Sequence, residues 1–349
     1  MTIDSMTING TRRHDEQRHR NEAAAVAIAG ATGYAGQELV RLLARHPAAT
    51  LVAAMSSGTS SAPRPLPALA RIWDDPVVPL DVERIAAEAQ VAFLALPEAA
   101  SAEVGTALVA RGVRVIDLSG AFRLRDASAR AKWYPATTAL PEGVVYGLPE
   151  RQRDAIRLAR LVSCPGCYPT ASLLALEPLA DAGVLQGPIV IDAKSGISGA
   201  GKTPTDRTHF SENHGSVAAY GVFSHRHGAE MEQELGMPVT FVPHLVPLDR
   251  GILTTIYASL RPGTGEADVA ALFAAAYADA PFVRLTGSAL PEIKHVAHTN
   301  FCDVGWRVDE ATGRVVLVAC IDNLVKGAAG QAVQAFNLAL GLDERMGLL

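Results

Sequence analysis

The sequence contains few cysteines, no strong charge bias and no long apolar run. Four cysteines in 349 residues are too few for a disulfide scaffold, and they favour a reducing, cytoplasmic compartment. The formal net charge is -5 and no long basic stretch follows residue 20, so a nucleic-acid partner is not expected. The longest strand-like apolar run, 315–321, is far shorter than the roughly 18 residues that cross a bilayer. The N-terminus also lacks the apolar core of a signal peptide, so we expect no membrane partner.

The chain is long enough for two domains. Hydrophobic residues make up 49% and charged residues 19%, which is typical of a folded globular protein. A length of 349 residues exceeds the usual size of a single hydrophobic core. Residues 1–22 are polar and show no periodicity, so we predict that they form a disordered extension.

The segment 163–170 combines two cysteines with residues that break helices. Pro165 and Gly166 cannot continue a helix, whereas the apolar segment 171–176 has helical periodicity. This pattern places Cys167 at or just before a helix N-terminus, where free N–H groups and the helix dipole favour negative charge. We expect this position to lower the pKa of the Cys167 thiol from its usual value of about 8.5, which would make the thiol a nucleophile. A buried structural cysteine is the alternative interpretation.

A glycine-rich loop near the start of the chain predicts a dinucleotide site. The loop Gly30-Ala-Thr-Gly-Tyr-Ala-Gly36 follows a predicted strand at 26–29 and precedes an amphipathic helix at 37–46, with a second strand at 50–55. In such a unit the glycines let the backbone turn tightly and approach a pyrophosphate, which lies at the helix N-terminus. We therefore predict that the cofactor contacts Gly30, Thr32, Gly33, Tyr34, Ala35 and Gly36.

The residues after the second strand favour NADP(H) over NAD(H). An acidic residue at this point would bind the ribose 2′-hydroxyl of NAD and repel a 2′-phosphate. The chain instead has Ser56 and Ser57, which begin a run of neutral residues, with Arg64 close behind. The alternative is a solvated loop that contacts no ligand.

The alternation of strands and helices continues and brings two further candidates to the site. A predicted strand at 113–118 is followed by Ser119 and Arg123. Because the carboxyl ends of parallel strands face the ligand crevice of an open α/β sheet, both residues are expected near the ligands. A plain surface loop would have the same appearance in the sequence.

The second half of the chain contains a loop of small residues that ends in a cation. Successive backbone amides in Ser195-Gly-Ile-Ser-Gly-Ala-Gly-Lys202 are able to form an anion-binding nest. The loop is not a Walker A motif, because the spacing of its glycines and lysine differs. A flexible loop without a ligand is the alternative.

Two histidines and a carboxylate follow in His225-Arg-His227 and Glu230. A His-x-His pair is compatible with a metal site, but no third ligand cluster accompanies it, so we expect no metal. A histidine near a carboxylate is also typical of a general base and its orienting partner. A later loop, 243–250, adds one more cation, Arg250.

These motifs together resemble those of the N-acetyl-gamma-glutamyl-phosphate reductase family. The resemblance extends over about residues 26–348 and rests on several separate blocks. The blocks are Gly30-Ala-Thr-Gly-Tyr-Ala-Gly36, Pro165-Gly-Cys-Tyr-Pro-Thr-Ala171, Ser195-Gly-Ile-Ser-Gly-Ala-Gly-Lys202, 220–230, 243–253 and Ile321-Asp-Asn-Leu-Val-Lys-Gly-Ala-Ala-Gly-Gln331.

The resemblance implies an α/β fold with two domains. Residues 23–166 are expected to form a Rossmann NADP-binding domain, and 167–322 a catalytic and dimerisation domain of α/β (α+β) type with a mixed sheet. Residues 323–349 are expected to form a C-terminal helix that packs back on the first domain. The implied activity is the NADPH-dependent reduction of N-acetyl-gamma-glutamyl phosphate in arginine biosynthesis, by a homodimer or homotetramer.

The resemblance also assigns roles to particular residues. Cys167 is expected to be the nucleophile that forms a thioester, His225 the general acid/base and Glu230 the partner of His225. Asn323 is expected near the nicotinamide. The phosphate and carboxylate of the substrate are expected to be held by Ser195, Ser198, Gly199, Lys202, His227, Arg250 and Arg123.

The chain departs from the family pattern at a few positions, and other functions stay open. Cys164 occupies a place where the family usually has no thiol, and with Cys167 it matches the C-x-x-C spacing of thiol–disulfide oxidoreductases. That motif belongs in a small thioredoxin-like domain, whereas here it follows a dinucleotide-binding half. The segment 119–121 and Ala229 also differ from the usual pattern. Aminoadipyl-phosphate reduction in lysine biosynthesis, with a substrate one methylene longer, and an NADP-binding sensor without catalysis are the alternatives.

Overall fold

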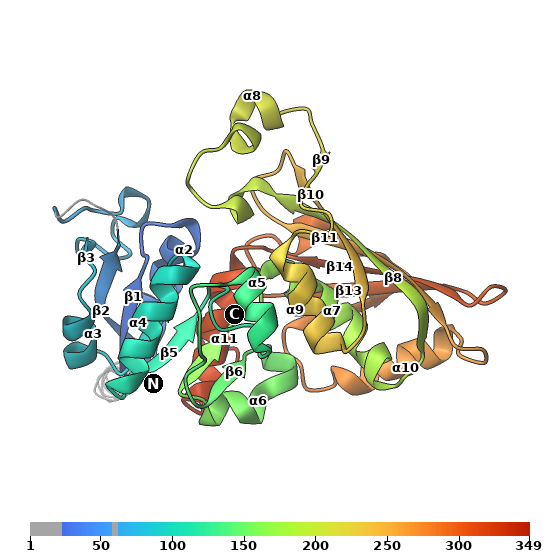
Figure 1. Cartoon of the computed structure of the whole chain (residues 1–349), viewed down its shortest axis with the longest axis horizontal. Coiled ribbons are helices and arrows are strands. Elements are labelled where there is room, and N and C mark those ends of the chain that lie inside the picture. Colours follow the sequence, from blue (N-terminus) through green and yellow to red (C-terminus); the bar gives the residue numbers. More distant parts are fainter. Residues whose placement is uncertain (1–22, 58–61) are drawn as a thin grey trace, which may run out of the picture.

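The computed structural model describes residues 23–57 and 62–349, so the extension predicted for residues 1–22 lies outside the described residues. Within the described ranges the chain forms two seven-stranded sheets that lie side by side, each with its own helices (Figure 1). The first sheet uses strands between residues 24 and 163, and the second uses strands between 185 and 321. The predicted fold class, a Rossmann domain followed by an α/β domain with a mixed sheet, is confirmed.

The first sheet is parallel and buried on both faces. Its strand order is β3-β2-β1-β4-β5-β7-β6, and the chain changes direction across the sheet at β1 and β4. Strand β4 is buried along its whole length, which is why it is a continuous apolar run rather than an alternating one. The strands are β1 (Ala24–Ala29), β2 (Ala49–Ser56), β3 (Val78–Pro79), β4 (Val91–Leu94), β5 (Arg114–Asp117), β6 (Val144–Tyr146) and β7 (Leu161–Ser163). The helices of this half are α2 (Tyr34–Leu43), α3 (Val82–Glu88), α4 (Glu98–Ala110), α5 (Ala127–Trp133) and α6 (Pro149–Leu158), with a 3₁₀ turn η1 (Pro67–Leu69).

The glycine loop has the close packing that the dinucleotide motif requires. Gly30 has a φ of 94°, and a side chain there would meet the Ala95 carbonyl oxygen at 2.2 Å. A side chain at Gly36 would meet the Gly30 carbonyl oxygen at 2.1 Å, so the first turn of α2 packs directly on the loop. Helix α2 begins at Tyr34, three residues before the predicted start, because the end of the loop already has helical geometry.

The second sheet is mixed, and three helices cover one of its faces. Its order is β12-β13-β14-β11-β8-β10-β9, with β8 and β10 parallel and β8 and β11 antiparallel. Buried and partly exposed residues alternate along β11, so one face of the sheet packs on the helices and the other does not. The strands are β8 (Leu185–Gly196), β9 (Ala218–Ala219), β10 (Val239–Val246), β11 (Ile252–Leu260), β12 (Val283–Gly287), β13 (Cys302–Asp309) and β14 (Arg314–Ile321). The covering helices are α7 (Cys167–Asp181), α9 (Arg226–Leu235) and α10 (Glu266–Ala276) (Figure 1).

A segment between β8 and α9 projects away from the body of the protein (Figure 1). It contains the short turns η2 (Ile197–Ala200) and η3 (Asp206–Thr208) and the helix α8 (Phe210–Asn213). Another short turn, η4 (Ile293–His295), precedes β13. Strand β10 extends to Val246, so the first half of the predicted 243–250 loop is in fact strand.

The end of the chain returns to the first sheet, as predicted. After β14 a π-helical turn η5 (Val325–Ala329) leads into α11 (Gly330–Ala339), which packs on α2, α6 and β5. All ten residues of α11 are buried, and its Phe336 ring lies 5.7 Å from that of Phe93 in β4. In the described part of the chain no helix is long and apolar enough to span a membrane.

Candidate active site

Cys167 is the first residue of α7, with Gly166 as the N-cap, so the predicted position of the thiol at a helix N-terminus is confirmed. The residue is partly buried and lines a cavity of about 350 Å³ between the two halves of the chain. The same cavity is lined by the cofactor loop and by most of the predicted ligand-binding residues. Those residues are Gly33, Tyr34, Ala35, Gly36, Ser119, Arg123, Ser198, Gly199, Lys202, His227 and Asn323.

The structure does not show the lowered thiol pKa that we expected from the position of Cys167 at a helix N-terminus. Burial raises the pKa of Cys167 to about 11, although the Arg123 charge and the Tyr168 backbone N–H lower it. The prediction of a lowered pKa is therefore wrong, because the loss of water around the sulfur outweighs the helix N-terminus. The thiol depends on nearby positive charge to become a thiolate.

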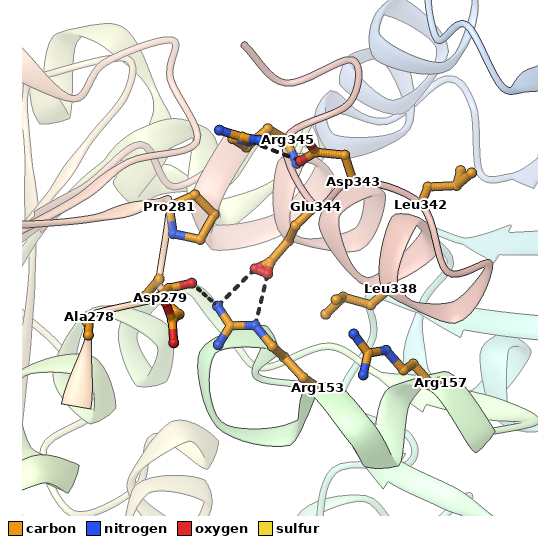
Figure 2. Close-up of a pocket in the computed structure, with 11 residues that line it drawn as sticks. Arg153, Arg157, Ala278, Asp279, Pro281, Leu338, Leu342, Asp343, Glu344 and Arg345 are labelled. Atoms are coloured by element: carbon orange, nitrogen blue, oxygen red, sulfur yellow. Dashed lines mark hydrogen bonds and ion pairs between the residues drawn. The ribbon is translucent and has the colours of Figure 1, made fainter. Parts of the chain in front are cut away.

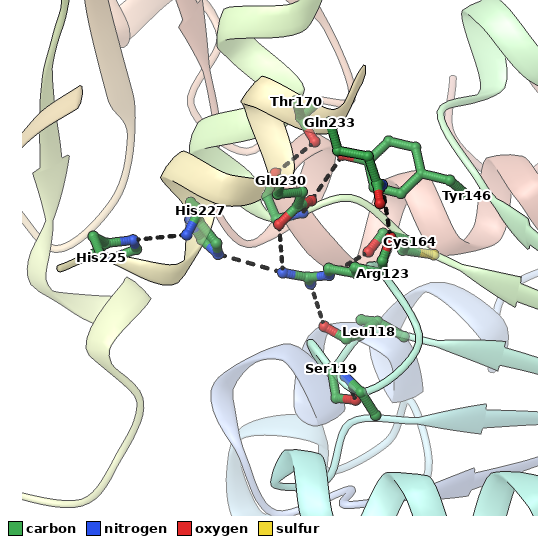
Figure 3. A network of polar contacts seen from close by, with 12 residues as sticks. Leu118, Ser119, Arg123, Tyr146, Cys164, Thr170, His225, His227, Glu230 and Gln233 are labelled. Carbon is green, nitrogen blue, oxygen red and sulfur yellow. Dashed lines mark hydrogen bonds and ion pairs between the residues drawn. The ribbon is translucent and has the colours of Figure 1, made fainter. Parts of the chain in front are cut away.

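Arg123 lies at the centre of a buried polar network that includes Cys164, His227 and Glu230 (Figure 3). Its Nε donates to the Cys164 carbonyl oxygen at 2.9 Å, and its NH2 group donates to the Leu118 carbonyl oxygen at 2.8 Å. Its NH1 group lies 3.3 Å from both Glu230 Oε2 and His227 Nε2. Most of its donors are engaged inside the protein, but Arg123 also lines the cavity, so its predicted contact with the substrate stays a prediction.

Glu230 is completely buried and faces the cysteine loop rather than His225. Its Oε1 accepts hydrogen bonds from the Tyr146 hydroxyl and from the Gly166 backbone N–H, both at 2.7 Å. Within the described residues no hydrogen bond or ion pair joins Glu230 to His225, so the predicted pairing is wrong. Five positions along a helix correspond to a rotation of about 140°, which turns the two side chains to different sides of α9.

The two histidines have different surroundings. His225 caps α9 through its Nδ1, which accepts the His227 backbone N–H at 3.2 Å, and its ring packs on Tyr168 and Phe241. Burial and the Arg226 charge lower the pKa of His225 to about 4. Burial, His225 and Arg123 hold the pKa of His227 well below its usual value. Both rings are therefore neutral near pH 7, and His227 is the one that lines the Cys167 cavity.

The predicted substrate loop contacts the cofactor loop in this structure. The Lys202 ammonium donates to the Thr32 carbonyl oxygen at 2.8 Å, and the Asn323 side chain donates to the Ser198 hydroxyl at 2.9 Å. The buried Ser195 hydroxyl donates to the neighbouring Gly196 carbonyl oxygen at 2.9 Å, and Ser195 is not among the residues that line the cavity. The loop therefore brings the two halves of the chain together around the cavity.

Arg250 links the two halves instead of facing the cysteine cavity. Its NH2 group lies 3.0 Å from Glu38 in α2, and its NH1 group lies 3.4 Å from the buried Asp322. These two carboxylates compensate its charge, and it lines a neighbouring cavity that shares Tyr34, Ser198 and Lys202 with the Cys167 cavity. The role of Arg250 as a substrate-binding cation stays a prediction, and in this structure its charge is paired with Glu38 and Asp322.

The end of β2 has the polar character expected of a site for NADP. Ser56 and Thr32 hydroxyls lie 3.3 Å apart, and the Arg64 NH2 group lies 3.5 Å from the Ser56 hydroxyl. Residues 58–61, which continue the neutral run, lie outside the described residues. Ser119 donates to the buried Asp117 carboxylate at 2.7 Å and accepts the Ala121 N–H, so it shapes the turn after β5.

Two features of the site could not be recognised in the sequence. Tyr146 lies in a short strand and has no motif around it, yet its hydroxyl is one of the three partners of Glu230. Gly327 in η5 packs against Cys167 so closely that a side chain there would meet the Cys167 Cβ at 2.7 Å. Both contacts depend on residues more than 80 positions apart in the chain.

A second cavity, of about 420 Å³, lies where α6, the end of α10 and the C-terminal segment meet (Figure 2). It is rich in arginine, but Arg153 pairs with Glu344 at 3.1 Å and Arg345 pairs with Asp343 at 2.7 Å. Arg157 is likewise paired within its own helix. These carboxylates neutralise the positive charge, so the cavity lacks the unbalanced charge of an anion site. In the residues that the structure describes, no group of three potential ligands is placed to hold a metal ion.

Comparison with known proteins identifies the class to which this fold and site belong. Residues 25–159 match the family model described as "Semialdehyde dehydrogenase, NAD binding domain", and residues 167–323 match "Semialdehyde dehydrogenase, dimerisation domain". The fold is similar to that of aspartate semialdehyde dehydrogenase II from Vibrio cholerae, with a TM-score of 0.71, 20% identity and coverage of 91% of this chain and 99% of that one. A structure of the Candida albicans aspartate semialdehyde dehydrogenase with NADP is also similar, with a TM-score of 0.68, 16% identity and coverage of 90% and 98%.

Curated relatives define the family more narrowly. The chain is 47% identical over 335 residues to an N-acetyl-gamma-glutamyl-phosphate reductase of Shouchella clausii, covering 93% of this chain and 97% of the relative. It is 44% identical over 344 residues to the reductase of the same name from Synechocystis, covering 94% and 97%. The chain belongs to the N-acetyl-gamma-glutamyl-phosphate reductase family.

Proposed function

We propose that this protein reduces N-acetyl-gamma-glutamyl phosphate with NADPH, giving N-acetylglutamate 5-semialdehyde and phosphate, in arginine biosynthesis. The observation that carries the proposal is the single cavity that contains both the dinucleotide loop and Cys167. A hydride donor and a nucleophile that share one cavity are what a thioester-forming reductase requires. The relatives named for this reaction match nearly the whole chain.

The residues at the first sheet fit an NADP cofactor. The three glycines of the loop bring no side chain to the backbone at the N-terminus of α2, and the N–H groups of the first helical turn have no intrahelical partner. Ser56 and Ser57 offer no negative charge against a 2′-phosphate, and Arg64 lies at the same end of β2. Bound NADPH would supply the hydride, and Asn323, at the cavity and hydrogen-bonded to Ser198, would face the nicotinamide end.

The cysteine carries the acyl group through the reaction. The Cys167 thiolate attacks the acyl carbonyl, the acyl–phosphate bond breaks and a thioester forms. After hydride addition to the thioester carbonyl, the tetrahedral adduct collapses, releasing the aldehyde and regenerating the thiolate. The predicted proton carrier is His225, but the geometry favours His227, because it is His227 that lines the cavity with Cys167. Ser198, Gly199 and Lys202 are the residues best placed to bind the substrate phosphate.

The direct test is an assay in the reverse direction, with N-acetylglutamate 5-semialdehyde, phosphate and NADP⁺, followed by absorbance of the reduced nicotinamide. We expect turnover with NADP⁺ and much weaker turnover with NAD⁺. Turnover of aminoadipate semialdehyde in place of the glutamate compound would retain the chemistry and assign the protein to lysine biosynthesis. Inactivity on both, with NADPH still bound, would leave only the sensor interpretation.

We also propose that a second copy of this chain covers the open face of the second sheet. The side chains on that face, which include Val190, His244, Thr255 and Tyr257, are partly exposed, and Tyr257 is 45% exposed. Tyr257 presents a large amphipathic surface of the type enriched at protein interfaces. The family model that matches residues 167–323 is described as a dimerisation domain. We propose in addition that the two domains meet at 166/167 and that the C-terminal segment begins at 323. A cytoplasmic location, where the four free thiols would stay reduced, is part of the proposal too.

A charge placed on this face is expected to separate the subunits. We predict that Tyr257→Glu sediments as a monomer at micromolar concentration, whereas the wild type sediments as a dimer or tetramer, because a buried unpaired carboxylate destabilises an interface. Leu158→Glu is a matched control, since Leu158 is 85% exposed on α6 in the other half of the chain. A monomeric wild type, or dissociation by both substitutions, would contradict the assignment of the interface to this sheet.

A further inference from the structure

The loop that carries Cys167 is held at both of its ends by one buried ion pair. Arg123 Nε donates to the carbonyl oxygen of Cys164, at the start of the loop. Glu230 Oε1 accepts the backbone N–H of Gly166, immediately before Cys167. The two side chains meet at 3.3 Å, and their exposed fractions are 7% and 0% (Figure 3). Pro165 lies between the two anchored groups and has no N–H to contribute.

Tyr146, which does not line the cavity, completes the arrangement. Its hydroxyl donates to the same Glu230 oxygen that holds Gly166, at 2.7 Å, so the carboxylate is surrounded by three donors. Burial opposes the charge on Arg123, but Glu230, with Tyr134, Tyr146 and Asp117, raises the pKa of the guanidinium above its already high value. Arg123 is therefore a permanent cation at this site.

We propose that Arg123, Glu230 and Tyr146 form the positioning unit of the nucleophile: the ion pair fixes the turn before Cys167 at both ends and keeps one positive charge beside the thiol. Glu230 thereby acts through the cysteine loop and not through His225. The unit rests on the proposed function only in that Cys167 is taken as the nucleophile.

The geometry explains why a buried ion pair is retained at this position. A buried pair contributes little net stability, because desolvation offsets the attraction, but it does impose a defined arrangement on the groups around it. Here those groups are the backbone atoms of the Cys167 loop. Gly166 has no room for a side chain, since a Cβ there would lie 2.8 Å from the Arg123 NH1 atom and 2.4 Å from His227 Nε2. The guanidinium and the imidazole therefore pack directly against the backbone that leads into Cys167.

The two charges of the ion pair shift the pKa of the Cys167 thiol in opposite directions. The Arg123 charge lowers the pKa of Cys167 and the Glu230 charge raises it, after the larger effect of burial. Removal of the cation leaves less thiolate at a given pH, and removal of the anion leaves more. A residue that only supports the fold would not produce this difference in sign.

The test is the rate at which iodoacetamide alkylates Cys167 in the unliganded protein at pH 8, measured by peptide mass spectrometry. We expect Arg123→Gln to be alkylated several-fold more slowly than the wild type and Glu230→Gln several-fold faster. A shift of one pKa unit corresponds to about a tenfold change in thiolate. His225→Asn is the control and should be alkylated at the wild-type rate. The proposal is overturned if both substitutions change the rate in the same direction, or if Glu230→Gln behaves like His225→Asn.

If Arg123→Gln and Glu230→Gln do not fold, Tyr146→Phe tests the same positioning role without a change of charge. Loss of one donor leaves the Glu230 charge less screened, so we expect slower alkylation and a several-fold lower kcat, with the dissociation constant for NADPH unchanged. An unaltered alkylation rate and kcat in this variant would contradict the positioning role. Alkylation of Cys167 requires no turnover. An inactive wild type would therefore refute the proposed function, whereas the alkylation rates of the variants would still test the positioning role.

Discussion

Replacement of Cys167 by serine is expected to abolish reduction of the acyl phosphate, with kcat/KM falling by at least about 10⁴-fold. A serine hydroxyl does not ionise near neutral pH and is a far weaker nucleophile than a thiolate, so the covalent intermediate cannot form at a useful rate. The nicotinamide cofactor should still bind, because the glycine loop and the end of β2 are unaffected. The measurement is NADPH consumption in the presence of the acyl phosphate, together with fluorescence titration of NADPH.

Cys164→Ser is the matched control and is expected to keep activity within a few-fold of the wild type. Cys164 is buried, and burial together with Asp117 raises the pKa of its thiol to about 12. It packs in the hydrophobic cluster of the first sheet, whereas Cys167 packs against the cluster of the second. Its contact with Arg123 is made by the backbone carbonyl, which serine retains. Equal losses in the two variants would argue that both thiols take part in the reaction.

Replacement of His227 by asparagine is expected to lower kcat by about 10²–10⁴-fold, the usual range for loss of a general acid or base. His227 lines the cavity with Cys167, whereas His225 caps α9 and packs among Tyr168 and Phe241. We therefore expect a smaller loss in His225→Asn. A larger loss in His225→Asn would restore the role that the family resemblance assigns to that residue.

The pH dependence of kcat/KM supplies a second measurement on the same histidines. The pKa of His225 is lowered to about 4 by burial and Arg226, and that of His227 is lowered well below its usual value by burial and by nearby positive charge. A lowered pKa means that the neutral ring persists as the pH falls through 6.5, so protonation of these rings should not reduce activity until the pH is well below that value. An acid limb at pH 6.5 in the wild type, absent from His227→Asn, would show that His227 titrates like an exposed histidine.

Local patterns in the sequence were sufficient for the elements and for the type of site. The glycine loop, the strand before it and the helix after it predicted the dinucleotide site, because a βα turn and its glycines are short-range features. Pro165 and Gly166 predicted the start of α7 at Cys167 for the same reason. The family resemblance supplied the C-terminal helix and its return to the first sheet, which α11 confirms.

The partners of the charged residues were decided by the tertiary structure. Glu230 binds Arg123 and Tyr146, which are 107 and 84 positions away in the sequence, rather than His225, which is only five positions away. Arg250 is compensated by Glu38 from α2, a residue 212 positions away, and so it does not face the Cys167 cavity.

The electrostatic state of the nucleophile also depended on the whole fold. The sequence alone determined that Cys167 begins a helix, and from this a lowered thiol pKa was expected. The direction of the shift is set by how much water the sulfur loses and by which charges lie beside it, and burial proved the larger effect. Desolvation and long-range ion pairs arise only when distant segments pack together. Residue types and spacing therefore determined which reactive groups are present, but not the pKa of the Cys167 thiol.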